Sequence, residues 1–330
     1  MYRAKMKLSG CGAKKSKWKR VLSAALVGGL LLVGGDQALA EAATDGMQAF
    51  REVYFATPSP DRRLFREDVT FFGPAFHADI DCMGQTMQDG NLAMFGSLDW
   101  MFTDLDTGKT NRVQIPFYVD GQGSTIYAKR DRRWAKIALP GLPVMIFNAL
   151  RTADSKDAPN DMSAIKRVEL LQETEKQRSM RITLDSARTA ALLETSGEGD
   201  IAALPPAEQD QQRQILRRMA RAVRDTEVTL VWVVDKTTWL TKTASVDFTD
   251  LVRAYAKGVL KEAENGSIQL ANDERAMLDT IGYYSEMRLY LSYMGDQNAD
   301  LAVPSEVRQS ATERDVFADL RADVISTVEK

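Results

Sequence analysis

Residues 226–248 read TEVTLVWVVDKTTWLTKTASVDF and decide the fold class of the chain. In their first half, Val228, Leu230, Trp232 and Val234 occupy every second position. Residues 235–238 (DKTT) supply turn formers, and the chain then returns through a second run rich in Thr, Ser and Val. Alternation with a period of two indicates a half-buried strand, so this stretch predicts a β-hairpin with one apolar face.

The same alternation of apolar and polar residues recurs in the first half of the chain. Residues 92–102 (LAMFGSLDWMF) place large apolar side chains on one face, and residues 113–119, 124–128 and 132–136 continue the alternation. Short segments with Gly and Asp separate these runs, as is typical of hairpin turns. Consecutive antiparallel strands are therefore expected here.

The rest of the chain predicts further strands and several helices. Strands are expected at 76–82, 163–173, 177–185, 285–294 and, closing the sheet, 303–307. Helices are expected at 46–57, 144–150, 186–195 with Ser186 as its N-cap, 207–224, 251–264 and 273–282. Nine or ten strands in two runs, each followed by helices, predict an α+β fold with a largely antiparallel sheet.

The N-terminus has the pattern of a secretory signal peptide. A basic segment ends at Lys19-Arg20, an apolar run covers 21–35, and Ala38-Leu39-Ala40 offers small residues for cleavage. The run of about 15 residues is shorter than the roughly 20 that span a bilayer, which favours cleavage over a retained anchor. We therefore expect a signal peptide at 1–40 and a mature protein in the periplasm or another extracytoplasmic part of the cell envelope.

Composition and charge exclude several function classes. The 330 residues are 44% apolar and 27% charged, which is typical of a globular protein. Eight of the 43 Lys and Arg, but only one of the 46 Asp and Glu, precede residue 41, so the remainder has 35 basic and 45 acidic residues and a net charge of −10. Such an acidic body is a poor binder of nucleic acid. With one His in the chain and only Cys82 after residue 40, no disulfide, metal site or cofactor is expected.

The order of these elements resembles the LolA-like lipoprotein-carrier superfamily and the mycobacterial LppX-type lipoproteins. The resemblance rests on the signal peptide, the meander from Leu92 to Lys136, the apolar segment after Pro140, the second hairpin with its turn at 235–239, and the segment LAVPSEV at 301–307. It implies a strongly curved, largely antiparallel and unclosed half β-barrel at 41–312, with helices over its concave face and an apolar cavity beneath them. Residues 313–330 are then a C-terminal helical tail.

This resemblance identifies a set of candidate cavity residues, most of them on the apolar faces of the predicted strands. The alternative is that the same side chains fill an ordinary core. The candidates are Met94, Leu98, Trp100, Phe117, Ile126, Val144, Ile146, Phe147, Leu230, Trp232, Val234, Met287, Leu289, Leu291 and Tyr293.

Other residues with reactive side chains have simpler interpretations. Cys82 is expected to be a small buried strand residue, and His77 a sheet-face residue rather than a base. The pairs Asp79/Asp81 and Asp104/Asp106, which could bind a cation, are interpreted as solvated strand positions, and Gly121 to Ser124 as a turn rather than a phosphate loop. The basic helix face at 217–224 could meet lipid headgroups or an acidic partner, but a solvated face is favoured.

Two functions remain. The first is a non-catalytic, exported protein that binds a lipid or an acylated protein in an apolar cavity, with 144–150 as a candidate gate and with peripheral membrane contact. The second is an envelope interaction or sensory scaffold whose core is filled by its own side chains and which binds a protein partner. An enzyme is disfavoured because titratable residues of catalytic type are scarce.

Overall fold

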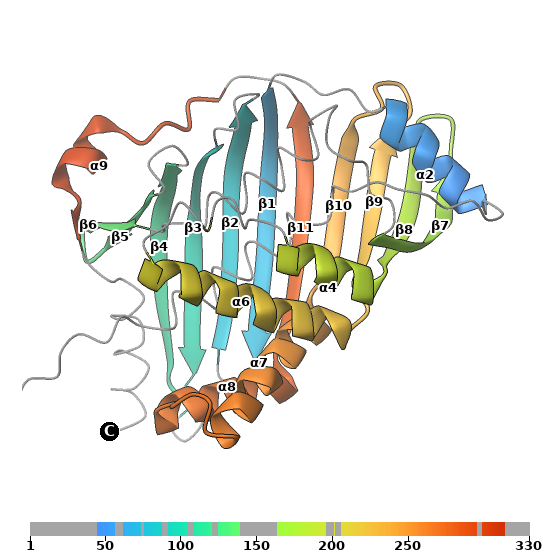
Figure 1. The fold of residues 1–330 in the computed structure, drawn as a ribbon. Helices are drawn as coiled ribbons and strands as arrows, with labels where there is room; N and C mark the ends of the chain where they lie inside the picture. Colours follow the sequence, from blue (N-terminus) through green and yellow to red (C-terminus); the bar gives the residue numbers. More distant parts are fainter. Residues whose placement is uncertain are drawn as a thin grey trace, which may run out of the picture.

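A computed structural model describes residues 45–56, 62–73, 76–87, 92–103, 108–120, 125–138, 164–195, 201, 206–295 and 299–313. These form one twelve-stranded sheet with the order β12-β6-β5-β4-β3-β2-β1-β11-β10-β9-β8-β7 (Figure 1). All neighbouring strands are antiparallel except β12, which pairs parallel with β6. The strands are β1 (Arg62–Gly73), β2 (Phe76–Met87), β3 (Leu92–Thr103), β4 (Thr110–Asp120), β5 (Thr125–Arg130), β6 (Arg133–Ala138), β7 (Ile165–Glu173), β8 (Gln177–Leu184), β9 (Thr229–Asp235), β10 (Thr241–Asp247), β11 (Glu286–Gly295) and β12 (Thr312–Glu313).

The longer helices lie over one face and one end of this sheet. They are α2 (Asp45–Ala56), α4 (Ser186–Thr195), α6 (Pro206–Arg224), α7 (Thr249–Glu264) and α8 (Asn272–Tyr284). In Figure 1, α2, α4 and α6 lie in front of the sheet, and α7 and α8 lie at its lower end. Helix α2 packs against β7, α7 against β11, and α4 and α7 on either side against α6. We call the sheet face toward these helices the inner face, and the opposite one the outer face.

The α+β class and the unclosed, largely antiparallel sheet are confirmed, but the strong curvature is not. The sheet is broad and not strongly curled (Figure 1). A line of paired residues from Glu67 in β1 through Cys82 and Gly96 to Phe117 in β4 stays near the middle of each strand. Curling toward a barrel needs a progressive stagger between strands, and this register supplies little of it.

Most predicted elements lie where the sequence places them. The hairpin of residues 226–248 is β9 and β10, and its turn is held by Asp235, whose Oδ1 accepts hydrogen bonds from the backbone N–H groups of Thr237 (2.8 Å) and Thr238 (3.0 Å). Helix α4 has the predicted bounds, but its cap is Asp185 instead of Ser186. Asp185 Oδ1 accepts from the N–H of Arg188 at 2.9 Å, while the Ser186 hydroxyl donates to the carbonyl of Thr226.

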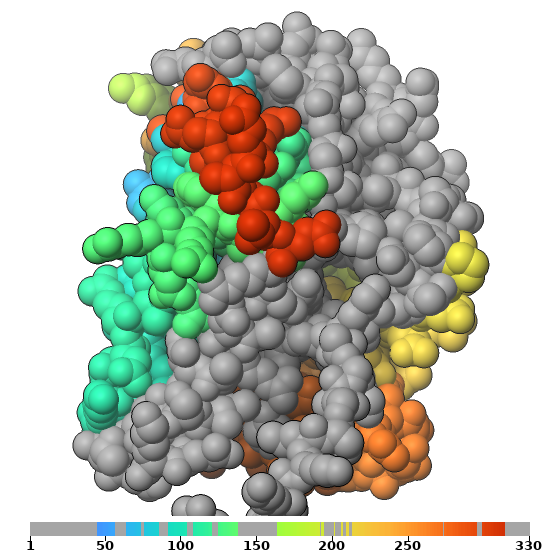
Figure 2. Space-filling view, turned by 90° about the vertical axis from the view of Figure 1, so that its left-hand side faces the viewer, coloured from blue at the N-terminus to red at the C-terminus, as the bar shows by residue number. Residues whose placement is uncertain are grey.

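The strand predicted at 303–307 is wrong, because this segment begins helix α9 (Ser305–Ser310). Pro304 has no N–H for a strand ladder, and its carbonyl accepts hydrogen bonds from Val307 (3.0 Å) and Arg308 (3.1 Å). Figure 2 looks onto this edge of the sheet, where α9 and β12 (red) lie against β5 and β6 (green). Val307 is buried there with Tyr127 of β5.

The core is divided among several clusters along the sheet. The largest joins α2 to β8, β9, β10 and β11, and includes Phe50, Met180, Val234 and Met287. A second spans β2 to β6, and a third packs α7 and α8 against Phe76 at the end of β2. Helices α4 and α6 form a cluster of their own.

Candidate functional site

The structure brings all twelve described candidate residues onto the inner face. The pairing of neighbouring strands places most of them beside other residues of the same face. The pairs Met94 with Val119 and Leu98 with Ile115 join β3 to β4. The twelve are Met94, Leu98, Trp100, Phe117, Ile126, Leu230, Trp232, Val234, Met287, Leu289, Leu291 and Tyr293. The other three, Val144, Ile146 and Phe147, lie outside the described residues, as do the predicted gate and the tail at 314–330.

Burial divides these twelve residues into two groups. One is packed, with at most 7% of each side chain exposed, and consists of Met94, Leu98, Leu230, Val234, Met287 and Leu289. The other keeps part of its surface accessible to solvent, and consists of Trp100, Phe117, Ile126, Trp232, Leu291 and Tyr293. Ile80 of β2 behaves in the same way. The middle of the inner face thus retains accessible apolar surface.

The helices over the inner face pack on one another. Helices α4 and α6 bury Ala190, Leu193, Ala220 and Val223 against each other, together with Leu251 of α7. Helix α6 lies between α4 and α7 and contacts both. Helices α4, α6 and α7 are therefore tied to one another, and Ile215, Leu216 and Met219 on α6 are buried as well.

The most unusual residue of the inner face is Glu67, which the sequence analysis did not single out. It lies in β1, one of the two central strands, between Phe65 and Val69, and is only 1% exposed. Its Oε1 has no hydrogen-bond partner within the part of the chain that the structure describes. Burial, with a smaller contribution from the charge of Asp68, raises the pKa of Glu67 to about 7.

Cys82 is a small buried residue of the inner face, as predicted. It is 2% exposed and lies directly across from Glu67 in the neighbouring strand. Burial raises the pKa of its thiol, and the charges of Glu67, Asp81 and Asp68 add to this effect. The thiol is therefore protonated at neutral pH, which is opposite to what a nucleophile requires.

The other polar candidates of β2 point to the outer face. His77 contacts Asp79 (Nε2 to Oδ1, 2.9 Å), and Asp81 accepts a hydrogen bond from Arg66 at 2.8 Å. These exposed contacts, one within β2 and one between β1 and β2, match the interpretation of the residues as sheet-face positions. In the described ranges, no group of three or more His, Cys, Asp and Glu is arranged to hold a metal ion. Asp104/Asp106 and the turn at 121–124 lie outside these ranges.

The basic face of α6 mainly ties the helices together. Arg218 and Arg221 both pair with Glu262 of α7, at 2.7 and 2.9 Å, and Arg224 pairs with Glu194 of α4 at 2.8 Å. These pairs use three of the four arginines of this face within the protein. The interpretation as a headgroup-binding surface therefore loses most of its basis.

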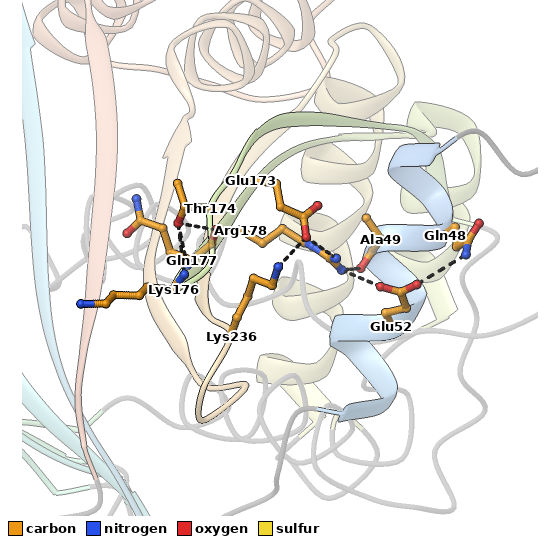
Figure 3. A network of polar contacts seen from close by, with 9 residues as sticks. All are labelled: Gln48, Ala49, Glu52, Glu173, Thr174, Lys176, Gln177, Arg178 and Lys236. Atoms are coloured by element: carbon orange, nitrogen blue, oxygen red, sulfur yellow. Dashed lines mark hydrogen bonds and ion pairs between the residues drawn. The ribbon is translucent and has the colours of Figure 1, made fainter.

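A second buried charge, Arg178 of β8, anchors the N-terminal helix (Figure 3). Its Nη1 donates to the carbonyl of Ala49 (3.0 Å) and to Glu52 (2.9 Å), and its Nη2 donates to Glu173 (2.8 Å). Lys236 donates to the same Glu173 oxygen at 2.7 Å. These two hydrogen bonds lower the pKa of Glu173 to about 2. Arg178 is thus committed to holding α2 on the sheet.

Comparison with known proteins gives similarity at the level of structure only. No family model and no curated protein sequence matches the chain. The structure is similar to that of LprF from Mycobacterium bovis, with 9% identity, 77% of this chain and 97% of that chain covered, and a TM-score of 0.36. It is also similar to a LolA superfamily protein from Nitrosomonas europaea (8% identity, 80% and 97% covered, TM-score 0.21) and to a porin-like protein from Bacteroides uniformis (8% identity, 72% and 98% covered, TM-score 0.18). The residues below therefore carry the functional argument by themselves.

Proposed function

We propose that this chain is a non-catalytic, exported protein of the bacterial cell envelope that binds a lipid or an acyl-bearing molecule between the inner face and the helices. The observation that carries this proposal is the accessible apolar surface in the middle of the inner face. Trp100, Phe117, Ile126 and Leu291 belong to the face on the side of the helices and yet remain partly exposed. Apolar side chains in such a position are normally covered by packing.

The chemistry of this surface suits flexible hydrocarbon. Phe, Trp, Ile and Leu side chains offer no charge, and each buried methylene of an acyl chain contributes about 0.8 kcal/mol. Arg178, a buried cation of this face, is already bound to Glu52 and Glu173. Arg178 is therefore not free to bind a charged headgroup.

No helix in the described ranges is long and apolar enough to cross a membrane. Release of a bound lipid to a membrane or to another protein would depend on the difference in affinity between donor and acceptor. We propose carriage or sensing of lipids in the envelope as the role, with the periplasm or another extracytoplasmic compartment as its location.

The first test is to export the chain in a bacterial host, purify it without detergent and extract it for lipid mass spectrometry. An acyl species that stays with the protein in stoichiometric amount through gel filtration is the expected result. A folded, lipid-free protein that also takes up no lipid from vesicles of phosphatidylethanolamine and phosphatidylglycerol would refute the proposal. The protein-interaction scaffold with a filled core would then remain.

A pair of substitutions in β11 locates the bound lipid. Leu291→Trp adds bulk to the accessible surface of the inner face, whereas Tyr290→Trp changes the neighbouring position, which points to the outer face and is 44% exposed. We expect Leu291→Trp to reduce the retained lipid several-fold while the fold survives, and Tyr290→Trp to leave it unchanged. The same substitution at Leu230 is less informative, because Leu230 is 7% exposed and overpacking there destabilises by about 1–3 kcal/mol. Equal lipid content in both β11 variants would place the lipid elsewhere.

A further inference from the structure

A row of small side chains crosses the middle of the inner face, and Glu67 is its one ionisable carboxyl group. Pairing across the strands aligns Glu67 with Cys82 and then with Gly96, and beyond Phe117 the same row continues through alanines 128 and 135. The rows on either side carry larger residues. One contains Val69, Ile80, Leu98 and Ile115, and the other contains Phe65, Met94, Val119 and Ile126.

The close approach of the strands explains why small residues occupy this row. A Cβ atom added to Gly96 would lie 2.4 Å from the Cβ of Cys82 and 2.4 Å from the carbonyl oxygen of Asp81. A larger residue at Gly96 is therefore excluded by the neighbouring strand. Glu67, Cys82, Gly96, Ala128 and Ala135 of this row are all buried.

The carboxyl of Glu67 is a buried polar group whose missing hydrogen-bond partner a ligand could supply. It is almost fully buried, and its Oε1 is without a hydrogen-bond partner among the described residues. Native proteins pair nearly all buried polar atoms, so an orphaned one in an apolar surface needs a cause. Leu291, its cross-strand neighbour in β11, belongs to the partly exposed group, so accessible surface lies next to it.

The charges around Glu67 keep the group in its neutral form. Burial raises the pKa of Glu67 most. The charge of Asp68, which is next in the strand and points to the outer face, raises it further, and Asp81, across from Asp68, points the same way. On the inner face the direct cross-strand neighbours are Cys82 and Leu291, and neither supplies a positive charge. With its pKa at about 7, the carboxyl is largely protonated in mildly acidic solution and can donate one hydrogen bond.

We propose that Glu67 is the polar anchor of the acyl-binding surface and donates a hydrogen bond to the carbonyl oxygen of a neutral acyl ester. This inference rests on the proposed function and specifies its ligand class. The ester carbonyl lies at Glu67, and the acyl chain lies over the partly exposed apolar residues of the inner face, beginning at Leu291 beside it. A free fatty acid is disfavoured, because its carboxylate would lie beside an acidic group in a region of low dielectric.

The test compares three ligands of equal chain length with the full chain after delipidation. They are 1-monolauroylglycerol, its ether analogue 1-O-dodecylglycerol, which lacks the carbonyl, and laurate, each titrated below its critical micelle concentration at pH 6.0 and pH 8.5. At pH 6.0 the protein should bind the ester about tenfold more tightly than the ether, the size expected for one net hydrogen bond. At pH 8.5 this preference should disappear, since a carboxylate cannot donate.

Two variants and one control complete the test. Glu67→Leu should bind ester and ether equally, whereas Glu67→Gln, which keeps a donor, should retain the ester preference and lose its pH dependence. Asp81→Asn, across from Asp68 on the outer face, should behave as the original protein does. Should Glu67→Leu fail to fold, the ester-to-ether ratio of the unaltered protein at the two pH values still decides the question.

The outcomes separate this inference from the proposed function. A protein that binds ester and ether with equal affinity at both pH values overturns the role of Glu67 and leaves the acyl-binding surface intact. A preference for laurate over the ester also overturns it. A protein that binds none of the three ligands refutes both proposals together.

Discussion

Replacement of Glu67 by Gln should remove a loss of stability that the unaltered protein shows as the pH rises. In the folded protein the pKa of Glu67 is raised from 4.5 to about 7 by burial. Between these values the folded state holds a proton that the unfolded state has released. The free energy of unfolding therefore falls as the pH rises from about 4.5 to about 7, and the loss is complete above that range.

The size of the effect follows from the two pKa values. At about 1.4 kcal/mol for each pH unit between them, the ionisation of Glu67 lowers the free energy of unfolding by about 3 kcal/mol at pH 8. This is a substantial part of the roughly 5–15 kcal/mol that stabilises a typical domain. Glu67→Gln has no such dependence, so the variant should be clearly more stable than the original protein at pH 8 and close to it at pH 4.5.

Urea unfolding followed by far-UV circular dichroism measures this directly. Both proteins are unfolded at pH 4.5, 5.5, 6.5, 7.5 and 8.5, and the difference in their free energies of unfolding is plotted against pH. All other titrating groups are common to the two proteins and cancel in the difference. A difference that stays constant across this range would show that Glu67 ionises normally, and the argument from its burial would then be refuted.

Three further predictions concern stability. Arg178→Met should destabilise the protein by about 3 kcal/mol in urea unfolding, because it leaves the buried carbonyl of Ala49 unpaired and removes the ion pairs with Glu52 and Glu173. Arg181→Met, which removes an exposed pair, should have an effect below about 1 kcal/mol, and equal effects would contradict the anchoring role. Gly96→Ala should destabilise the protein by about 1–3 kcal/mol in thermal melts, because the added Cβ atom meets the neighbouring strand. Gly258→Ala in α7, where an added Cβ atom has no other atom within 4 Å, should stabilise it by about 0.5–1 kcal/mol. The reverse order would mean that the strands do not approach as described. The hydrogen bonds to Glu173 stabilise the fold above pH 4.5, and this stabilisation is lost as the pH falls toward 2. The free energy of unfolding of Glu173→Gln should therefore be lower than that of the original protein at pH 5 and approach it at pH 2. A difference between the two proteins that does not change with pH would count against this.

The parts of the fold with a regular pattern were predictable from sequence. In the hairpin of β9 and β10 and in the meander from β3 to β6, alternating apolar residues and turn residues indicate strands and their connections clearly. Both ends of helix α4 were predicted at the correct residue. The shared inner face follows from the same alternation. The sequence-based prediction failed where a local signal competes with tertiary context, as at Pro304, where a short apolar run begins a helix.

Strand β1 was not predicted, although it lies near the middle of the sheet. Its inner positions are Phe65, Glu67, Val69 and Phe71, and a Glu in this series, flanked by Arg66 and Asp68, hides the apolar period. The residue that breaks the pattern is also the one we propose as the ligand contact. Strand β11 posed the opposite problem: its alternation was evident, but its place between β1 and β10 depends on pairing that is remote in sequence.

The two edge strands of this open sheet affect whether the protein stays soluble or aggregates. An unprotected edge strand is a template for pairing with another chain, and a sheet that does not close retains two edges. At one edge, β7 has two irregularities in register, at Ile165/Arg167 and at Leu170/Gln172, and α2 packs against it. At the other, β12 offers only two residues. Both edges are thereby poor templates, so the sheet can remain open to accommodate a ligand without also offering ends along which molecules would polymerise into fibres.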